Sequence, residues 1–161
     1  MFRTRDYAVI TSHRTAIRRN KASAPLCNLQ RMGVLRGRIL DYGCGHGSDV
    51  KYLEMSGMDV SGYDPYWLPE EPVGSYDTIT CTYVLNVVGI DQEKEIIERI
   101  RRLLSPGGRA FLTVRRDLKG LKNPNIGVVT RRGMQRHVEL SLPLLLEERG
   151  KYCTYLLLFE V

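Results

Sequence analysis

The chain has 161 residues, 43% of them hydrophobic and 26% charged, with a formal net charge of +6. This composition is that of one ordinary globular domain, and it excludes a low-complexity or disordered chain. No apolar run has the length of a signal peptide or a membrane span, so we expect a soluble, cytoplasmic protein that does not contact a membrane. The four cysteines are scattered without a C-x-x-C pair, which indicates neither a zinc site nor a disulfide framework.

Charge is segregated along the chain. Residues 1–38 hold nine Lys/Arg and one acid, residues 39–108 hold five and twelve, and residues 109–137 hold eight and one. Two basic blocks around an acidic middle favour a surface that meets an anionic partner.

Glycine, proline and hydrophobic periodicity predict the elements of the first half. In chain order these are a helix from about Pro25 to Gly33, a strand over 38–42, a helix over 48–56 and a strand over 58–63. The glycine-rich segment 43–47 must turn between the first strand and its helix. This strand-helix-strand order predicts parallel neighbouring strands with a right-handed crossover.

The second half continues the same alternation and then becomes β. We expect a strand over 76–84, an amphipathic helix over 91–104, a strand over 109–114, an exposed basic loop over 115–127 and a closing antiparallel hairpin from 142–148 and 152–161. The predicted fold is a single α/β, Rossmann-like domain with a mostly parallel sheet. Its parts are an N-terminal basic and helical segment (1–36), a core (38–115), and a basic loop with the hairpin (116–161).

The glycine loop lies where open α/β sheets bind ligands, after the first strand. Its glycines, Gly43, Gly45 and Gly47, do not have the G-x-G-x-x-G spacing of a dinucleotide site. Asp41 beside the loop would repel a pyrophosphate and suit a ligand that carries a cationic amino group and a sulfonium. Asp64, at the end of the next strand, can accept both hydroxyls of a ribose. Two alternatives stay open: a structural turn that binds nothing, and a nicotinamide enzyme.

The segments ILDYGCGHG, GYDP and YDTITCTYVLNVV resemble motifs of class I S-adenosylmethionine-dependent methyltransferases. The resemblance covers roughly residues 38–115 and implies the methyltransferase form of the Rossmann-like sheet. It places Asp41 and the backbone of the three glycines around the methionine part of the cofactor, and Asp64 on its ribose. The further candidate cofactor contacts are Tyr42, Cys44, Pro65, Tyr66, Arg19 and Lys21.

Both flanks add a narrower resemblance. RRNKASAP and TRRGMQ are similar to the flanks of small uncharacterised bacterial methyltransferases associated with DNA phosphorothioation. Arg19, Lys21, Ser23 and Pro25 match that pattern, whereas TRRGMQ departs from the expected G-T-F-Q. The resemblance supplies no acceptor.

Only twelve residues, 65–76, connect the second strand to the next one. A complete crossover needs more, so we expect the family's third strand and its helix, which normally wall the adenine, to be missing or shortened. Tyr66 and Trp67 would then cover the base, or they would cap the edge of the core.

Methyl transfer from a sulfonium needs alignment and a dry site, and it needs no nucleophilic residue. The three histidines, His13, His46 and His137, have no matching partners and are interpreted as solvated or structural. Tyr83 and Asn86, at and just after the end of the third predicted strand, are the candidates for positioning the acceptor. No Asp/Asn-Pro-Pro-aromatic run follows that strand, which disfavours methylation of an exocyclic base amine.

The two basic blocks should border the mouth of the site. Arg14, Arg18 and Arg19 would face Arg115 and Arg116, joined by Lys21, Lys119 and Lys122. Such a rim favours an anionic acceptor, with nucleic acid or a nucleotide ahead of a small acid. The alternative is a catalytically inactive module that binds S-adenosylmethionine together with nucleic acid or a protein partner.

Overall fold

The computed structural model describes residues 12–118 and 127–161, and its centre is a six-stranded sheet. The strand order is β2 (Val60–Tyr63), β1 (Ile39–Tyr42), β3 (Tyr76–Thr82), β4 (Leu104–Arg115), β8 (Tyr152–Leu158) and β7 (Leu144–Glu148). The first four strands run parallel, and β8 and β7 continue the sheet as an antiparallel pair. This is the predicted α/β sheet with its C-terminal hairpin.

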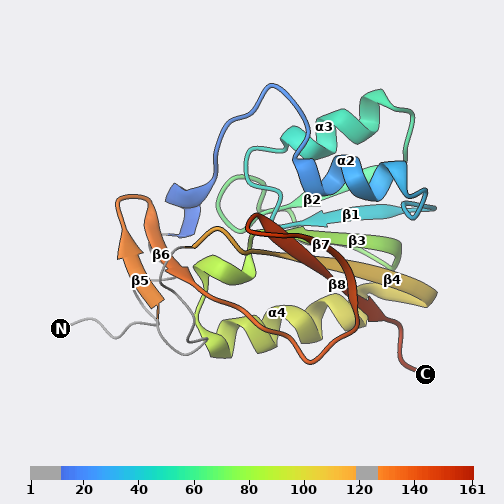
Figure 1. Ribbon diagram of the computed structural model, residues 1–161. Helices are drawn as coiled ribbons and strands as arrows, with labels where there is room; N and C mark the ends of the chain where they lie inside the picture. The colour runs from blue at the N-terminus through green and yellow to red at the C-terminus, as the bar shows by residue number, and fades with distance from the viewer. Residues whose placement is uncertain (1–11, 119–126) are drawn as a thin grey trace.

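Helices cover both faces of this sheet (Figure 1). Helices α2 (Ala24–Arg31) and α3 (Ser48–Met55) lie on one face, and α4 (Ile90–Leu103) lies on the other. Each layer buries an apolar cluster, because side chains of neighbouring positions on a strand point to opposite faces. Leu26, Leu29, Ile39, Leu53 and Phe111 are among the residues that fill the α2–α3 side, and Leu40, Ile79, Ile100 and Leu112 are among those that fill the α4 side.

Local sequence explains where the helices begin. Ser23 is the N-cap of α2: its hydroxyl accepts a hydrogen bond from the Leu26 backbone N–H, and Pro25 stands in the first turn. Helix α4 has acids in its first turn and arginines in its last, which complements the helix dipole. Among the described residues, no helix combines the length and apolar character needed to cross a bilayer.

Strand β2 forms the edge of the sheet, as the short connection predicts. The described segment that follows it, residues 64–75, holds one isolated bridge between Asp64 and Leu68 and no helix. The expectation that the third strand of the family is missing is therefore confirmed. Its absence leaves Tyr66 and Trp67 beside an open sheet edge.

One element was not predicted, a two-stranded hairpin of β5 (Gly127–Thr130) and β6 (Gly133–Arg136). It lies outside the main sheet, beside the 3₁₀ turns η1 (Ser12–Thr15) and η2 (Leu85–Val87) (Figure 1). The buried guanidinium of Arg136 attaches this hairpin to the start of α4. Nε of Arg136 donates to the Val88 carbonyl at 3.0 Å, and Nη2 pairs with Glu93. Most of the expected basic loop over 115–127, including Lys119 and Lys122, lies outside the described residues.

Candidate functional site

A cavity of about 860 Å³ opens at the carboxyl ends of β1 to β4. Its walls come from the loops that follow these strands, from one side of α4, from hairpin β5–β6 and from the N-terminal segment 12–19. Parallel sheets bind ligands at this edge, and the volume falls in the range of small-molecule and cofactor sites.

The glycine loop after β1 is pressed closely against its neighbours. The amides of Gly43 and Cys44 both donate to the Tyr63 carbonyl, at 2.7 and 3.0 Å. Gly43 has a φ of +79°, and a Cβ on it would lie 2.2 Å from a methyl of Val84. Only glycine fits there, so the backbone itself can form the cavity wall.

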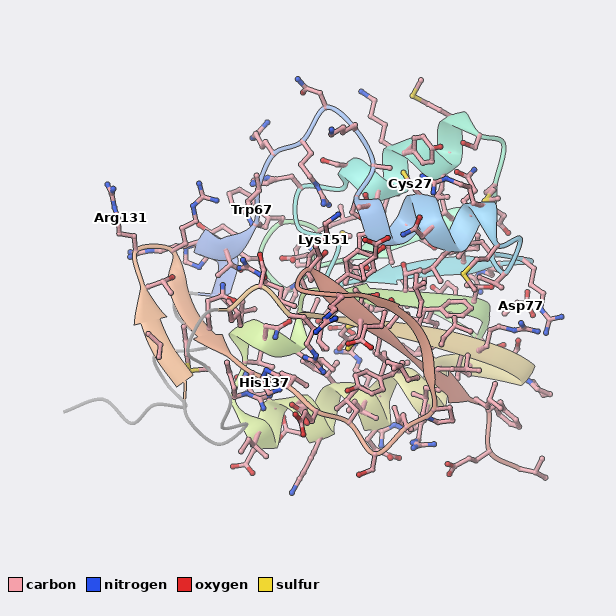
Figure 2. All side chains as sticks on the ribbon, viewed as in Figure 1. Cys27, Trp67, Asp77, Arg131, His137 and Lys151 are labelled. Carbon is pink, nitrogen blue, oxygen red and sulfur yellow. The ribbon has the colours of Figure 1, made fainter. Side chains whose placement is uncertain are left out.

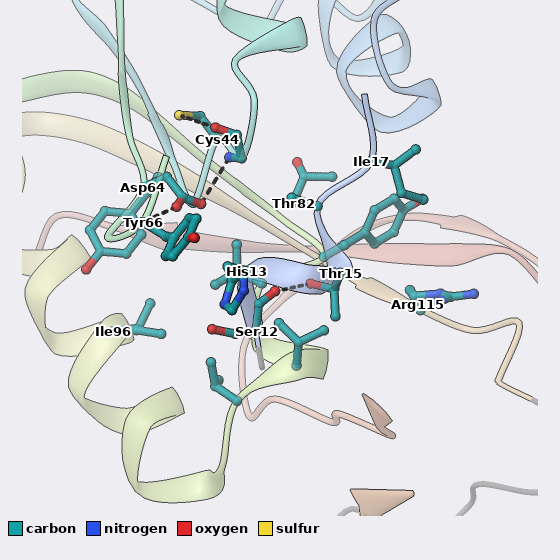
Figure 3. A pocket seen from close by; sticks show the side chains of 18 of the residues that line it. Ser12, His13, Thr15, Ile17, Cys44, Asp64, Tyr66, Thr82, Ile96 and Arg115 are labelled. Carbon is teal, nitrogen blue, oxygen red and sulfur yellow. Dashed lines mark hydrogen bonds between the residues drawn. The ribbon is translucent and has the colours of Figure 1, made fainter. Parts of the chain in front are cut away.

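Asp64 stands at the end of β2 and lines the cavity (Figure 3). One carboxylate oxygen, Oδ1, accepts the backbone N–H groups of Tyr66 and Trp67, both at 2.9 Å, and the other accepts that of Gly45 at 3.1 Å. These bonds fix the carboxylate between the two loops. A carboxylate has about four acceptor positions and three are taken, so one remains for a ribose hydroxyl.

Asp41 corrects an expectation from the sequence. Its side chain is only 4% exposed, lies under the loop, and does not line the cavity. Its Oδ1 accepts the Thr80 hydroxyl at 2.8 Å. Burial, followed by the charge of Asp49, raises the pKa of Asp41 to about 7. Direct selection of a cationic ligand by this carboxylate is therefore not supported, because the Asp41 side chain is buried, accepts the Thr80 hydroxyl and is not part of the cavity lining.

Asp49 anchors the N-terminal segment over the cavity. Its carboxylate accepts the Ser23 backbone N–H at 2.7 Å and the Ser23 hydroxyl at 2.6 Å, and the Arg19 guanidinium lies 3.5 Å away. The sequence alone did not single out Asp49 as a site residue, since no local pattern reports a partner 26 positions away. Arg19 lines the cavity, whereas Lys21 is exposed and does not.

An aromatic cluster closes the cavity near Asp64 (Figure 3). The His13 and Tyr66 rings are stacked with centroids 4.2 Å apart, and the His46 and Trp67 rings lie 4.1 Å apart. Tyr66 is 58% exposed, so it does not cap the core. Tyr66, His13 and His46 line the cavity, and sequence reasoning had not assigned the two histidines to the site.

Tyr83 forms part of the opposite wall and is the only described residue other than glycine with a positive φ, +61°. Such a conformation in a bulky residue is strained, and strain of this kind clusters at functional sites. Burial raises the pKa of Tyr83 to about 12, so its phenol stays protonated and can donate a hydrogen bond. Its ring meets that of Tyr152 edge to face.

Asn86, predicted to position the acceptor, has a structural role instead. It is fully buried and does not line the cavity. Its amide nitrogen donates to the Arg136 carbonyl and its oxygen accepts the Arg115 N–H, both at 2.8 Å. The sequence places Asn86 after β3 but cannot reveal that its amide bonds two backbone groups outside the cavity lining.

Only some of the predicted basic residues line the cavity. Arg115 lines it and pairs with Asp117 at 2.8 Å. Arg116 donates a hydrogen bond to the Tyr155 hydroxyl and lies outside the cavity lining. Arg14 and Arg18 are exposed and also stand outside it. Arg132 of hairpin β5–β6 and Lys151 line the wall and were not among the predicted site residues.

Of the predicted cofactor contacts, eight line the cavity: Arg19, Tyr42, Gly43, Cys44, Gly45, Asp64, Pro65 and Tyr66. Asp41, Gly47 and Lys21 do not. Burial raises the pKa of Cys44 to about 12, so this thiol is no ready nucleophile near neutral pH.

Comparison with known proteins decides the family. The sequence matches the "Methyltransferase domain" family over residues 13–155. This chain belongs to that family. It is an S-adenosylmethionine-dependent methyltransferase domain.

Individual relatives are distant. Ubiquinone biosynthesis O-methyltransferase of Pseudomonas aeruginosa is 27% identical over 117 residues, which cover 56% of this chain and 50% of the relative. The chain thus spans about half the length of the curated relatives it matches.

Solved structures share the fold. The 1,6-didemethyltoxoflavin-N1-methyltransferase of Burkholderia thailandensis, solved with 1,6-didemethyltoxoflavin and S-adenosylhomocysteine, has a TM-score of 0.64 at 18% identity, covering 84% of this chain and 77% of its own. A Bacteroides fragilis S-adenosylmethionine-dependent methyltransferase with S-adenosylhomocysteine has a TM-score of 0.60 at 15% identity, covering 81% and 76%.

Proposed function

We propose that this domain transfers the methyl group of S-adenosylmethionine to an anionic acceptor, with a nucleotide or nucleic acid ahead of a small acid. The observation that carries the proposal is the charge of the cavity wall. Among the described residues, five cations line the cavity and three acids oppose them: Arg19, Arg99, Arg115, Arg132 and Lys151 against Asp64, Glu95 and Asp117. A low-dielectric cavity strengthens the attraction of such a wall for an anion.

The cofactor site fits S-adenosylmethionine on the chain's own residues. Gly43 and Gly45 line the cavity with bare backbone, and Asp64 keeps one acceptor position for a ribose hydroxyl. When bound, the cofactor supplies a methyl group on a sulfonium, which is already activated for displacement. Tyr83 and Val84, at the end of β3, would then border the reacting centre.

The residues that line the cavity would orient the acceptor and the cofactor and exclude water from them. The His13–Tyr66 stack and the N-terminal segment cover one side of the cavity, and Tyr83 offers a phenolic donor on the other. In-line displacement needs alignment of acceptor and sulfonium, and no covalent intermediate is required. This accounts for a site without an activated nucleophile.

Transfer of tritiated methyl to pooled nucleotides, RNA, DNA and an acidic-metabolite extract tests the proposal. Label should enter an anionic fraction, and Arg132→Gln and Lys151→Gln should raise the acceptor KM about tenfold, with S-adenosylhomocysteine affinity unchanged. Arg102→Gln, an exposed arginine on α4, is the matched control. Label confined to neutral acceptors would contradict the anionic acceptor, and no label in any fraction would favour the inactive binding module.

Salt distinguishes nucleic acid from a single nucleotide. An acceptor that contacts several phosphates loses affinity steeply as salt rises. Arg14 and Arg18 lie outside the cavity, so they could contribute only to a long acceptor. If the acceptor affinity depends only weakly on salt, and Arg14→Gln/Arg18→Gln does not change that dependence, the acceptor is a nucleotide or a small acid.

We further infer that the chain groups with the small bacterial methyltransferases associated with DNA phosphorothioation. The segment RRNKASAP supports this grouping, and its Arg19 and Ser23 both contact Asp49. The inference assigns no acceptor.

A further inference from the structure

Two residues that line the cavity carry a buried carboxamide oxygen without a hydrogen-bond partner. These are Oε1 of Gln92 on α4 and Oε1 of Gln135 on β6, the two unpartnered buried side-chain polar atoms of the described residues. Both residues line the cavity, and Gln135 is only 6% exposed. Buried polar groups in folded proteins are nearly always hydrogen-bonded, so this pair requires a physical explanation.

The two glutamines come from elements that one ion pair holds together. Arg136, next to Gln135, pairs with Glu93, next to Gln92. Arg136 also donates to the Val88 carbonyl at 3.0 Å. Hairpin β5–β6 is thereby fixed to the start of α4, and both carboxamides belong to a rigid part of the wall.

Apolar side chains form the rest of this region. We call it the carboxamide subsite: Gln92 and Gln135 with Val84, Val87, Val88 and Ile96. An apolar wall with a few fixed hydrogen-bonding groups is the usual composition of a ligand pocket. Val84 packs against Gly43 of the glycine loop, whereas Gln135 belongs to the separate hairpin β5–β6. This favours assigning the subsite to the acceptor over the cofactor.

We propose that the carboxamide subsite binds a planar part of the acceptor that carries N–H donors, as a nucleobase does, while Arg115, Arg132 and Lys151 hold its anionic part. This inference rests on the proposed anionic acceptor and narrows its chemical class. A buried acceptor without a donor costs free energy. A ligand that supplies the missing N–H donors should therefore bind more tightly than one that lacks them.

Binding to the protein saturated with S-adenosylhomocysteine tests the inference, because the cofactor then occupies its own site. The probes are AMP, GMP, CMP and UMP, all with N–H donors, together with ribose 5-phosphate and purine riboside 5′-monophosphate, which lack N–H donors on a ring. At least one of the four nucleotides should bind three- to tenfold more tightly than both donor-free probes. Gln135→Met and Gln92→Met should remove this preference.

Two controls separate a binding role from a structural one. Gln30→Met changes a glutamine remote from the cavity, whose oxygen accepts the Tyr52 hydroxyl, and should leave nucleotide binding unchanged. The ligand-free melting temperature of Gln135→Met should stay level or rise, because the variant removes an unsatisfied polar atom. A fall in that temperature with unchanged binding would overturn the inference in favour of a structural glutamine.

Equal binding of all six probes in wild type and variants would overturn the carboxamide subsite but not the anionic acceptor. If none of the six phosphate-containing probes binds, both proposals are overturned. Weaker S-adenosylhomocysteine binding in Gln92→Met or Gln135→Met would assign the carboxamides to the cofactor and refute their role in the acceptor site.

Discussion

Burial of Asp41 links the charge of this carboxylate to the stability of the fold. Its pKa rises from 3.8 to about 7, so the folded chain retains a proton that the unfolded chain releases within this range. The folded state binds more protons there, and stability should therefore fall as the pH rises from about 4 to 7.

Asp41→Asn tests this dependence, because asparagine keeps an oxygen for the Thr80 hydroxyl and removes the buried charge. We expect it to stabilise the protein by roughly 2–4 kcal/mol at pH 8 and by less at pH 5. Urea unfolding at both pH values measures the difference, with exposed Asp59→Asn as the control. An equal effect of Asp41→Asn at pH 5 and pH 8 would refute the raised pKa.

Asn86 stabilises the junction of β4 and β6, since its amide satisfies two backbone groups. Asn86→Ala leaves the Arg136 carbonyl and the Arg115 N–H unpaired and should cost about 2–3 kcal/mol. Chemical denaturation measures the loss. Full stability combined with lost methyl transfer would restore Asn86 as an acceptor-positioning residue.

The N-terminal segment is the element whose attachment most directly controls access to the cavity. Residues 12–19 cover the site, and the contacts of Ser23 and Arg19 with Asp49 fix this segment to the start of α3. The same Asp49 carboxylate therefore supports α2, α3 and the cavity wall together.

Asp49→Ala should free this segment. Trypsin should cleave at Arg18, Arg19 or Lys21 at least several-fold faster, and S-adenosylhomocysteine should bind more weakly. Mass spectrometry of the fragments over time provides the measurement. Glu54→Ala, an exposed change on the same helix, is the control. Identical cleavage rates in the two variants would show that Asp49 does not hold the segment.

At the scale of the whole molecule, the sequence was sufficient for the elements of the sheet layer, the mostly parallel sheet and its closing antiparallel hairpin. Periodicity and glycine positions predicted the strands and helices of the sheet layer, and the short connection after Tyr63 predicted the missing strand. These features are local: a strand's alternation or a helix's cap is encoded within a few residues. The glycine loop and Asp64 were predicted from equally local features. The loop has three glycines within five residues, and Asp64 directly follows a predicted strand.

The contacts that the sequence did not reveal are long-range. Burial of Asp41 depends on β2 and β3 packing on both sides of β1, and the direction of the Asn86 amide depends on Arg136, 50 residues later. Hairpin β5–β6 is held by side-chain bonds to η2 and α4, which no period of hydrophobic residues records. Figure 2 shows its Arg131 pointing away from the rest of the molecule, as expected of a small hairpin without a core of its own.

The central claim is that the cavity lined by the glycine loop and Asp64 binds the adenosyl cofactor. Isothermal titration calorimetry of S-adenosylhomocysteine with wild type, Asp64→Asn and the exposed control Asp59→Asn tests it most directly. Asparagine keeps an oxygen for the Tyr66 and Trp67 amides but loses the acceptor of the Gly45 N–H, so an unchanged melting temperature of the variant is required as a control for its fold. We predict binding by wild type and Asp59→Asn, and affinity at least about tenfold weaker for Asp64→Asn. Equal affinity in all three proteins would contradict the claim.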